Sequence, residues 1–193
     1  MRNTIASLVA ALSLNFVAPT VQAASFTLDK SHTAVTFSID HLGFSLVQGR
    51  FDEFDADIDF DSENPENSTV TFTIEAPSVE TGWAKRDQQI RGADFLNVVE
   101  HPAIVFASKQ IDVTGHDTAI MVGELSMNGK TREETFDVRM RKLAPSPFGQ
   151  NLLTGGFVAE AAIDRTSYGV SYGADAIGNE VLVRVDLEIV EDQ

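Results

Sequence analysis

The chain has 193 residues, 43% of them hydrophobic, and a formal net charge of -15, which is enough for one domain with a substantial core. Such an acidic surface repels phosphates, so nucleic acid and bare anionic membranes are excluded as favourable partners. The sequence has no cysteine, which excludes disulfides, thiolate catalysis, iron–sulfur clusters and cysteine-ligated zinc.

The first 23 residues have the features of a secretory signal peptide. Arg2 precedes an apolar stretch over 5–17, and Val21 and Ala23 place small residues before a cleavage point. We therefore expect a periplasmic protein whose one domain covers 24–193, and its charge is -16 because Arg2 is the only charged residue removed. No later stretch approaches the roughly 18 uncharged residues of a spanning helix, so stable membrane insertion is not expected.

Period-two alternation dominates the rest of the chain. From Phe54 to Asp61 every even position is apolar and every odd position is an aspartate, a pattern typical of a β-strand with one dry face. A shorter apolar run covers 25–29. The same alternation recurs over 33–40, 68–76, 135–141, 156–164 and 180–189.

Two further runs, 104–113 and 119–127, are apolar on both faces, and the second is followed by the hairpin dipeptide Asn128-Gly129. Eight or nine such strands must close into a barrel or stack as two sheets, because open edges remain as pairing sites. The pattern favours an all-β, eight-stranded antiparallel barrel, which is wide enough for one small ligand. The two-sided runs could also pair two chains, so a homodimer is slightly favoured over a monomer.

The segment 81–102 has no alternation and predicts a short helical segment around 84–97 plus irregular chain. Connections of this length are usually functional. Its charged residues could neutralise one another, as Arg86 with Asp87 and Arg91 with Asp94. Alternatively, one arginine could bind the head group of a ligand at the mouth of the barrel.

Motifs that indicate catalysis or metal binding lack their context. The run 169–173 spells G-x-S-x-G around Ser171, but a nucleophile elbow needs a strand–turn–helix and a downstream histidine, and none follows His116. We therefore expect no catalytic residue and no metal. The four histidines do not form a set with ligand spacing: His32, His41, His101 and His116.

Landmarks along the chain resemble the YceI-like family of bacterial periplasmic, lipocalin-like proteins, also described as polyisoprenoid-binding. The motifs that carry this resemblance are Asp29-x-x-His32-Thr33, His41-Leu42-Gly43-Phe44-Ser45, Gly49-Arg50-Phe51, Arg86-Asp87-x-x-Ile90-Arg91-x-x-Asp94-Phe95-Leu96, Ile163-Asp164-Arg165-x-x-Tyr168-Gly169-Val170 and Gly178-Asn179-Glu180-Val181. The chain departs from the family's usual residues at Thr33, Ala56 and Ile90. None of these changes removes a charged residue.

The resemblance implies an extended lipocalin-like barrel that holds a long-chain isoprenoid or a related amphiphile, such as a quinone, prenyl lipid or fatty amide, with no cofactor. The alternatives are an enzyme acting on a quinone-type lipid and a structural barrel without ligand. Residues expected in the lumen are Phe37, Ile39, Phe54, Ile58, Phe72, Ile74, Met121, Leu125, Phe136, Met140, Phe157, Val183 and Leu187. Residues expected at the mouth or head group are His32, Arg86, Arg91, Asp94 and Arg165. Because these cations are few and partly paired, we expect a neutral or weakly polar head.

Overall fold

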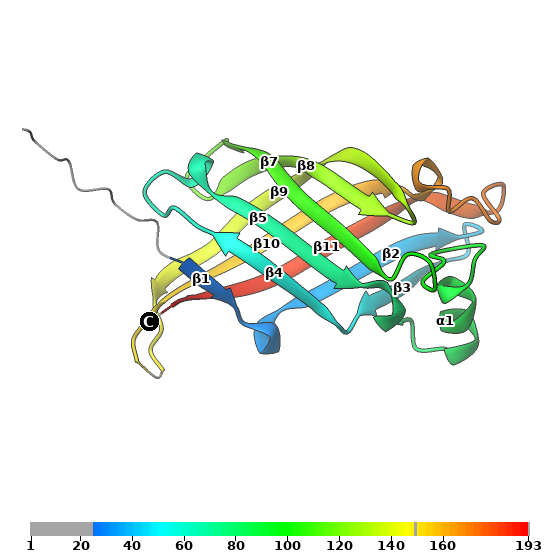
Figure 1. Cartoon of the computed structure of the whole chain (residues 1–193), viewed down its shortest axis with the longest axis horizontal. Coiled ribbons are helices and arrows are strands. Elements are labelled where there is room, and N and C mark those ends of the chain that lie inside the picture. The colour runs from blue at the N-terminus through cyan, green and yellow to red at the C-terminus, as the bar shows by residue number, and fades with distance from the viewer. Residues whose placement is uncertain (1–24, 149, 193) are drawn as a thin grey trace, which may run out of the picture.

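The computed structural model describes residues 25–148 and 150–192, so the expected signal peptide lies outside the described residues. The described chain forms one sheet of eleven strands and a short α-helix, α1 (Ala84–Arg91) (Figure 1). The strands are β1 (Ser25–Leu28), β2 (Ala34–His41), β3 (Ser45–Phe51), β4 (Phe54–Asp59), β5 (Thr69–Glu75), β6 (Val79–Glu80), β7 (Ala103–Val113), β8 (Thr118–Met127), β9 (Lys130–Pro145), β10 (Leu153–Asp164) and β11 (Ile177–Glu191). Within these ranges no helix is long and apolar enough to cross a membrane.

Eight of the strands close into an antiparallel barrel in the order β1, β4, β5, β7, β8, β9, β10, β11 and back to β1. The long strand β11 makes the closure, because its C-terminal part pairs with β1 and its N-terminal part pairs with β2. Beyond β2 the sheet continues through β3 to the short β6. The predicted eight-stranded barrel is confirmed, and the alternative of two stacked sheets is wrong.

The alternation seen in the sequence follows the pleat of the strands. In β4 the side chains of Asp55, Asp57 and Asp59 are exposed, whereas Ile58 between them is buried. Charged side chains remain hydrated on the outer face and apolar ones gather inside, so each strand has one register that satisfies both faces.

Two elements differ from the sequence-based expectation. Strand β3 lacks a visible alternation because Gly49 occupies its central inward position, where a Cβ would collide with the Phe37 ring. The helix ends at Arg91 instead of 97, since the Gly92 N–H bonds to the Gln89 carbonyl and the chain then turns irregularly toward β7.

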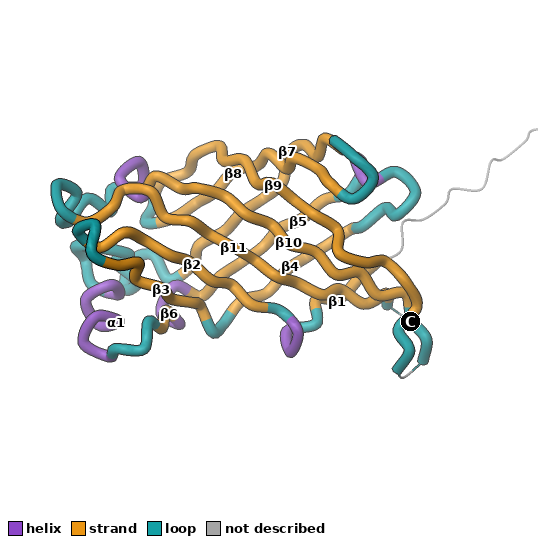
Figure 2. The backbone as a smooth tube through the Cα atoms, turned by 180° about the vertical axis from the view of Figure 1, so that it is seen from behind, coloured by secondary structure: helices purple, strands orange, loops and turns teal. Residues whose placement is uncertain are grey.

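The two ends of the barrel are built differently (Figures 1 and 2). The end with α1, here called the mouth, carries the connections 42–44, 81–102, 128–129 and 165–176. The far end carries 60–68, 114–117 and the C-terminus. There the rings of Phe26, Phe60 and Phe157 pack edge to face, with centroids 5.5 and 5.3 Å apart. These rings fill the barrel interior at the far end.

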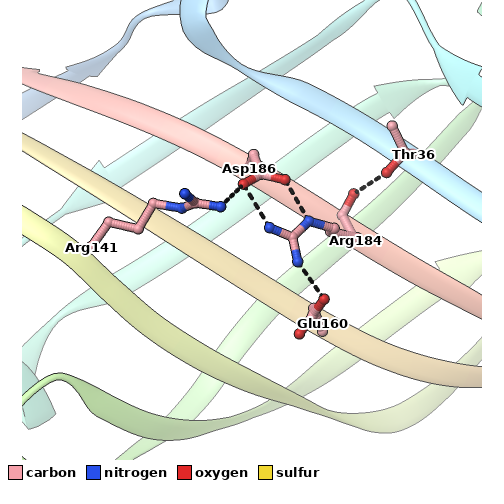
Figure 3. A network of polar contacts seen from close by, with 5 residues as sticks. All are labelled: Thr36, Arg141, Glu160, Arg184 and Asp186. Atoms are coloured by element: carbon pink, nitrogen blue, oxygen red, sulfur yellow. Dashed lines mark hydrogen bonds and ion pairs between the residues drawn. The ribbon is translucent and has the colours of Figure 1, made fainter.

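The outer wall carries a network of charged side chains (Figure 3). Arg184 contacts Glu160 at 2.6 Å and Asp186 at 2.6 Å, and Arg141 contacts Asp186 at 2.8 Å. The hydrogen bond from Arg184 is the main cause that lowers the pKa of Asp186. All four groups are more than a third exposed, so water screens the network and its contribution to stability is small.

Acid should destabilise the protein through Asp29, whose carboxylate accepts hydrogen bonds from Ser31 and His32. The Ser31 hydroxyl and then the His32 imidazole lower the pKa of Asp29 from 3.8 to about 2. This stabilisation is present above 3.8 and is lost as pH falls through about 2. We expect Asp29→Asn to cost about 1–2 kcal/mol at neutral pH and to flatten the fall between pH 4 and 2. Urea unfolding across this pH range measures the free energy of unfolding of both proteins. If it falls between pH 4 and 2 as steeply in Asp29→Asn as in the parent, the prediction is wrong.

Candidate functional site

An elongated cavity of about 490 Å³ occupies the mouth half of the barrel. Its deep part is lined by buried apolar side chains from many strands, among them Val35, Ile104 and Phe106. Apart from Thr36 on β2, the polar side chains of the lining cluster toward the mouth, and they are Asp40, His41, Ser45, Arg86, Gln89 and Arg165. A volume of this size is typical of small-molecule sites, which are about 300–1,000 Å³.

Nine of the thirteen residues expected in the lumen line this cavity: Phe37, Ile39, Phe72, Ile74, Met121, Leu125, Phe136, Val183 and Leu187. Four others do not. Ile58 is buried in the core and Phe54 and Phe157 pack against that core, and Phe157 belongs to the ring cluster of the far end. Met140 is half-buried beside Phe157 on the neighbouring strand.

Several lining residues were missed by the sequence analysis. Phe51 of β3 lies 5.6 Å from the Phe37 ring, and Phe106 lies 4.9 Å from the Phe136 ring. Val47 and Phe51 share the parity of Gly49, so a search that allows one glycine at an inward position would have found them. Ile104 and Phe106 were hidden because both faces of β7 are apolar.

Arg86 is the helix residue that brings a cationic group to the cavity. Its Nε donates to the Thr81 hydroxyl and its Nη2 to the Thr81 carbonyl, both at 2.7 Å, and its guanidinium lies over the Trp83 ring. The Thr81 hydroxyl donates in turn to Asp87, which is only 2% exposed. Arg86 and Asp87 are therefore linked through Thr81, and this linkage fixes the start of α1.

Three other residues expected at the mouth do not line the cavity. Arg91 donates to the backbone carbonyls of Pro77 and Val79 and holds the helix against that segment. Asp94 is exposed, and no ion pair joins it to Arg91 in the described structure. His32 lies in the turn between β1 and β2, where its Nδ1 is 2.7 Å from Asp29.

Arg165 lines the cavity but is 4% exposed and fully engaged. Its guanidinium donates five hydrogen bonds to oxygens of the segment that follows, at 2.6–3.4 Å: the carbonyls of Val170, Tyr172, Ile177 and Gly178, and Oδ1 of Asn179. Burial lowers its pKa, while the nearby Asp164 opposes this shift. The arginine thus shapes the connection 165–176 and has no donor left for a ligand.

Tyr168, within this connection, is completely buried. Its hydroxyl donates to Glu134 at 2.7 Å, and burial followed by this bond raises its pKa far above the ordinary value. Ser171 lies exposed in the same connection, between a 3-10 turn and β11. The strand–turn–helix of a nucleophile elbow is therefore absent around Ser171.

One group of metal-ligand type comes together outside the cavity. Asp29, His32 and Glu188 each place a ligand atom within 4.8 Å of the others. Glu188 was not anticipated, since it joins the motif only through the pairing of β11 with the chain around β1. Asp29 is already occupied by Ser31 and His32, so the group acts as a turn-capping cluster.

Comparisons with known proteins give a consistent result. The family model described as the YceI-like domain matches residues 26–189. The protein YceI of Escherichia coli O17:K52:H18 is 34% identical over 183 residues, 94% of each chain. The Campylobacter jejuni YCEI crystal structure superposes with a TM-score of 0.74 at 27% identity, covering 86% of this chain and 98% of that one. A polyisoprenoid binding domain from Saccharophagus degradans has the same fold, with a TM-score of 0.65 at 13% identity over 88% and 99% of the two chains.

Proposed function

This chain belongs to the YceI-like domain family, and on that premise we propose that it binds a long-chain isoprenoid or related amphiphilic lipid and carries it in the periplasm. The observation behind the proposal is the polarity gradient of the cavity, apolar in depth and polar at the mouth. Such a gradient orients an amphiphile with its chain inside and its head at the mouth. The structural likeness to the polyisoprenoid binding domain of Saccharophagus degradans supports the same class of ligand.

The apolar lining supplies the driving force. Burying roughly 300 Å² of ligand chain is worth on the order of 7 kcal/mol before the cost of association. A lining of Phe, Ile, Met and Val distinguishes chains by length and shape, so specificity for the chain should be broad. The choice among ligands then depends on the head group.

We expect a neutral or weakly polar head, such as a quinone ring or an amide. A diphosphate would need clustered cations with free donors. Of the two arginines on the cavity, Arg165 has no donor left, and Arg86 gives two of its five N–H donors to Thr81. A single, partly engaged cation is therefore available, which is less than a diphosphate needs. The expected affinity for a prenyl quinone therefore changes less than about twofold between low and high salt, because screening acts on exposed charges.

Titrations of a prenyl quinone and a prenyl diphosphate of equal chain length, at 20 mM and 500 mM salt, measure this. The control variant is Lys85→Ala, one residue from Arg86. Tighter diphosphate binding that collapses with salt and with Arg86→Ala, while Lys85→Ala has no effect, would contradict the neutral head. The proposal of a lipid in the barrel would stand in that case.

Native mass spectrometry of the protein from periplasmic extracts tests the proposed function directly. We expect a retained apolar mass that organic extraction removes and that added prenyl lipid restores. A protein refolded from urea without lipid is the control for adventitious detergent. Bare protein under gentle conditions, together with no uptake of prenyl lipid by the refolded form, would leave the barrel without a ligand and refute the proposal.

A further inference from the structure

Large hydrophobic side chains are exposed mainly at one end of the barrel. Nine such residues are exposed in the described chain, and six of them belong to the mouth end: Leu42 (48% exposed), Phe44 (87%), Leu46 (59%), Trp83 (58%), Val99 (91%) and Tyr172 (50%). We call these six residues the mouth patch. They come from three segments far apart in sequence, the β2–β3 hairpin and the connections 81–102 and 165–176, so their grouping is a product of the fold.

The mouth patch surrounds the entrance of the cavity. His41 and Ser45, which flank the β2–β3 turn, line the cavity, and so does Trp83 itself. On the neighbouring part of the rim the cavity residue Phe95 packs on Tyr172, with ring centroids 5.3 Å apart. Figure 1 shows the three connections together beside α1. Exposed apolar side chains therefore surround an entrance that is lined by polar groups.

The charge distribution separates the two ends. The mouth connections 42–44, 81–102, 128–129 and 165–176 contain four cations, Lys85, Arg86, Arg91 and Arg165, and four carboxylates, Asp87, Asp94, Glu100 and Asp175. The far-end connections 60–68 and 114–117 contain the carboxylates Asp61, Glu63, Glu66 and Asp117 and no Lys or Arg. The charges of the mouth connections thus balance in a protein with a net charge of -15, and the cavity entrance adds the carboxylate of Asp40.

We propose that the mouth patch docks on the surface of an uncharged or zwitterionic lipid bilayer, so that the ligand passes between bilayer and cavity without crossing water. This inference rests on the proposed lipid-binding function. Trp, Tyr, Phe and Leu are the side chains that enter the interfacial region of a bilayer. The balanced charges of the mouth connections reduce the repulsion that the rest of this acidic surface meets near lipid phosphates. The far end, whose connections 60–68 and 114–117 carry only carboxylates as charged groups, is directed away from the membrane.

A bilayer explains these features better than a second copy of the chain. The six side chains stand on separate turns around an opening, and a bilayer accommodates such an uneven rim, whereas a stable protein interface needs about 800 Å² of complementary surface on each partner. A copy seated on the mouth would also close the path by which the ligand enters the apolar interior.

Flotation with phosphatidylcholine vesicles tests the docking, and Trp83 reports it because the sequence has a single tryptophan. We expect the protein to float with the vesicles and the Trp83 emission to shift to shorter wavelength. Phe44→Glu should weaken partitioning to the vesicles by about tenfold or more. The variant places a charge where the phenylalanine ring would enter the bilayer interface. Phe148→Glu is the matched control, since Phe148 is 84% exposed but lies in the β9–β10 connection at the far end. Val99→Glu is a second variant on another mouth connection.

Uptake of a short, water-dispersed prenyl alcohol without vesicles separates this proposal from the proposed function. Docking is supported if Phe44→Glu and Val99→Glu keep that uptake but lose flotation and slow the uptake of lipid from vesicles. It is overturned if the parent takes up the alcohol but never floats, or if Phe148→Glu loses flotation equally. A light-scattering mass of two chains that Phe44→Glu reduces to one would instead assign the mouth patch to self-association. Failure of the parent to take up the alcohol would refute the proposed function itself.

Discussion

Phe72→Asp is expected to abolish ligand retention and to lower the free energy of unfolding by more than about 4 kcal/mol. Phe72 is 8% exposed, lines the cavity and stacks on Phe54 with ring centroids 5.9 Å apart. A carboxylate at this position would meet Phe106 on the paired strand and no cation. It must either remain charged in a dry cavity or take up a proton, and both are costly.

Two further variants show how the loss of stability depends on the charge and on the burial of the substituted position. Phe72→Ala should cost about 3 kcal/mol, because it removes a ring without burying a charge. Phe37→Asp should also abolish retention but destabilise less than Phe72→Asp, since Phe37 is only half-buried and near the mouth. Urea unfolding and native mass spectrometry measure the two outcomes. If Phe72→Asp retains lipid and unfolds like the parent, the side chain does not face the cavity.

Arg165→Met should lower the free energy of unfolding by about 3–5 kcal/mol, although Arg165 forms no ion pair shorter than 4 Å in the described structure. The substitution removes all five donors and leaves four backbone carbonyls and one amide oxygen without them. The Val170 carbonyl is buried and the others are partly shielded, so the acceptors that water does not reach keep the cost of their desolvation. The connection 165–176 should loosen as a consequence, and ligand should dissociate faster.

Arg184→Met is the matched control, because Arg184 is also an arginine on the barrel but is 39% exposed and bonds to carboxylates that water can solvate. We expect it to cost less than about 1 kcal/mol. Hydrogen exchange of the amides in 170–179 should rise in Arg165→Met alone. Equal unfolding midpoints for the two variants would show that the hydrogen bonds of Arg165 add little.

The sequence analysis predicted the barrel from features that a pattern can carry. Alternation assigns a side chain to the inner or outer face, and Phe72, Met121 and Val183 all line the cavity as expected. Alternation carries no information on position along the barrel axis. For that reason Ile58 and Phe157, although interior, pack at or toward the filled far end instead of the cavity.

The polar residues were harder to place. Arg165 was expected at the head group of the ligand, but its guanidinium bonds mainly to backbone carbonyls. A residue pattern does not reveal such partners, because every residue has a carbonyl. Arg91 was expected near Asp94 from helical spacing, but the helix ends at Arg91 and the side chain turns to Pro77 and Val79. Helical spacing predicts contacts only where the helix continues.

The pairing of β11 sets an order on the folding of the chain. This last strand hydrogen-bonds to β10, but also to β1 and β2, whose residues precede it by about 150 positions, as in the pairs Leu28 with Ile189 and Val35 with Val185. Contacts of such high sequence separation form late, because a long loop must close first. Nearly the whole chain must therefore be available in one compartment before the barrel can seal, and until then β1, β2 and β10 have unpaired edges that can associate with other chains. The intermediate that chaperones must protect is consequently an almost full-length chain that lacks only its final strand.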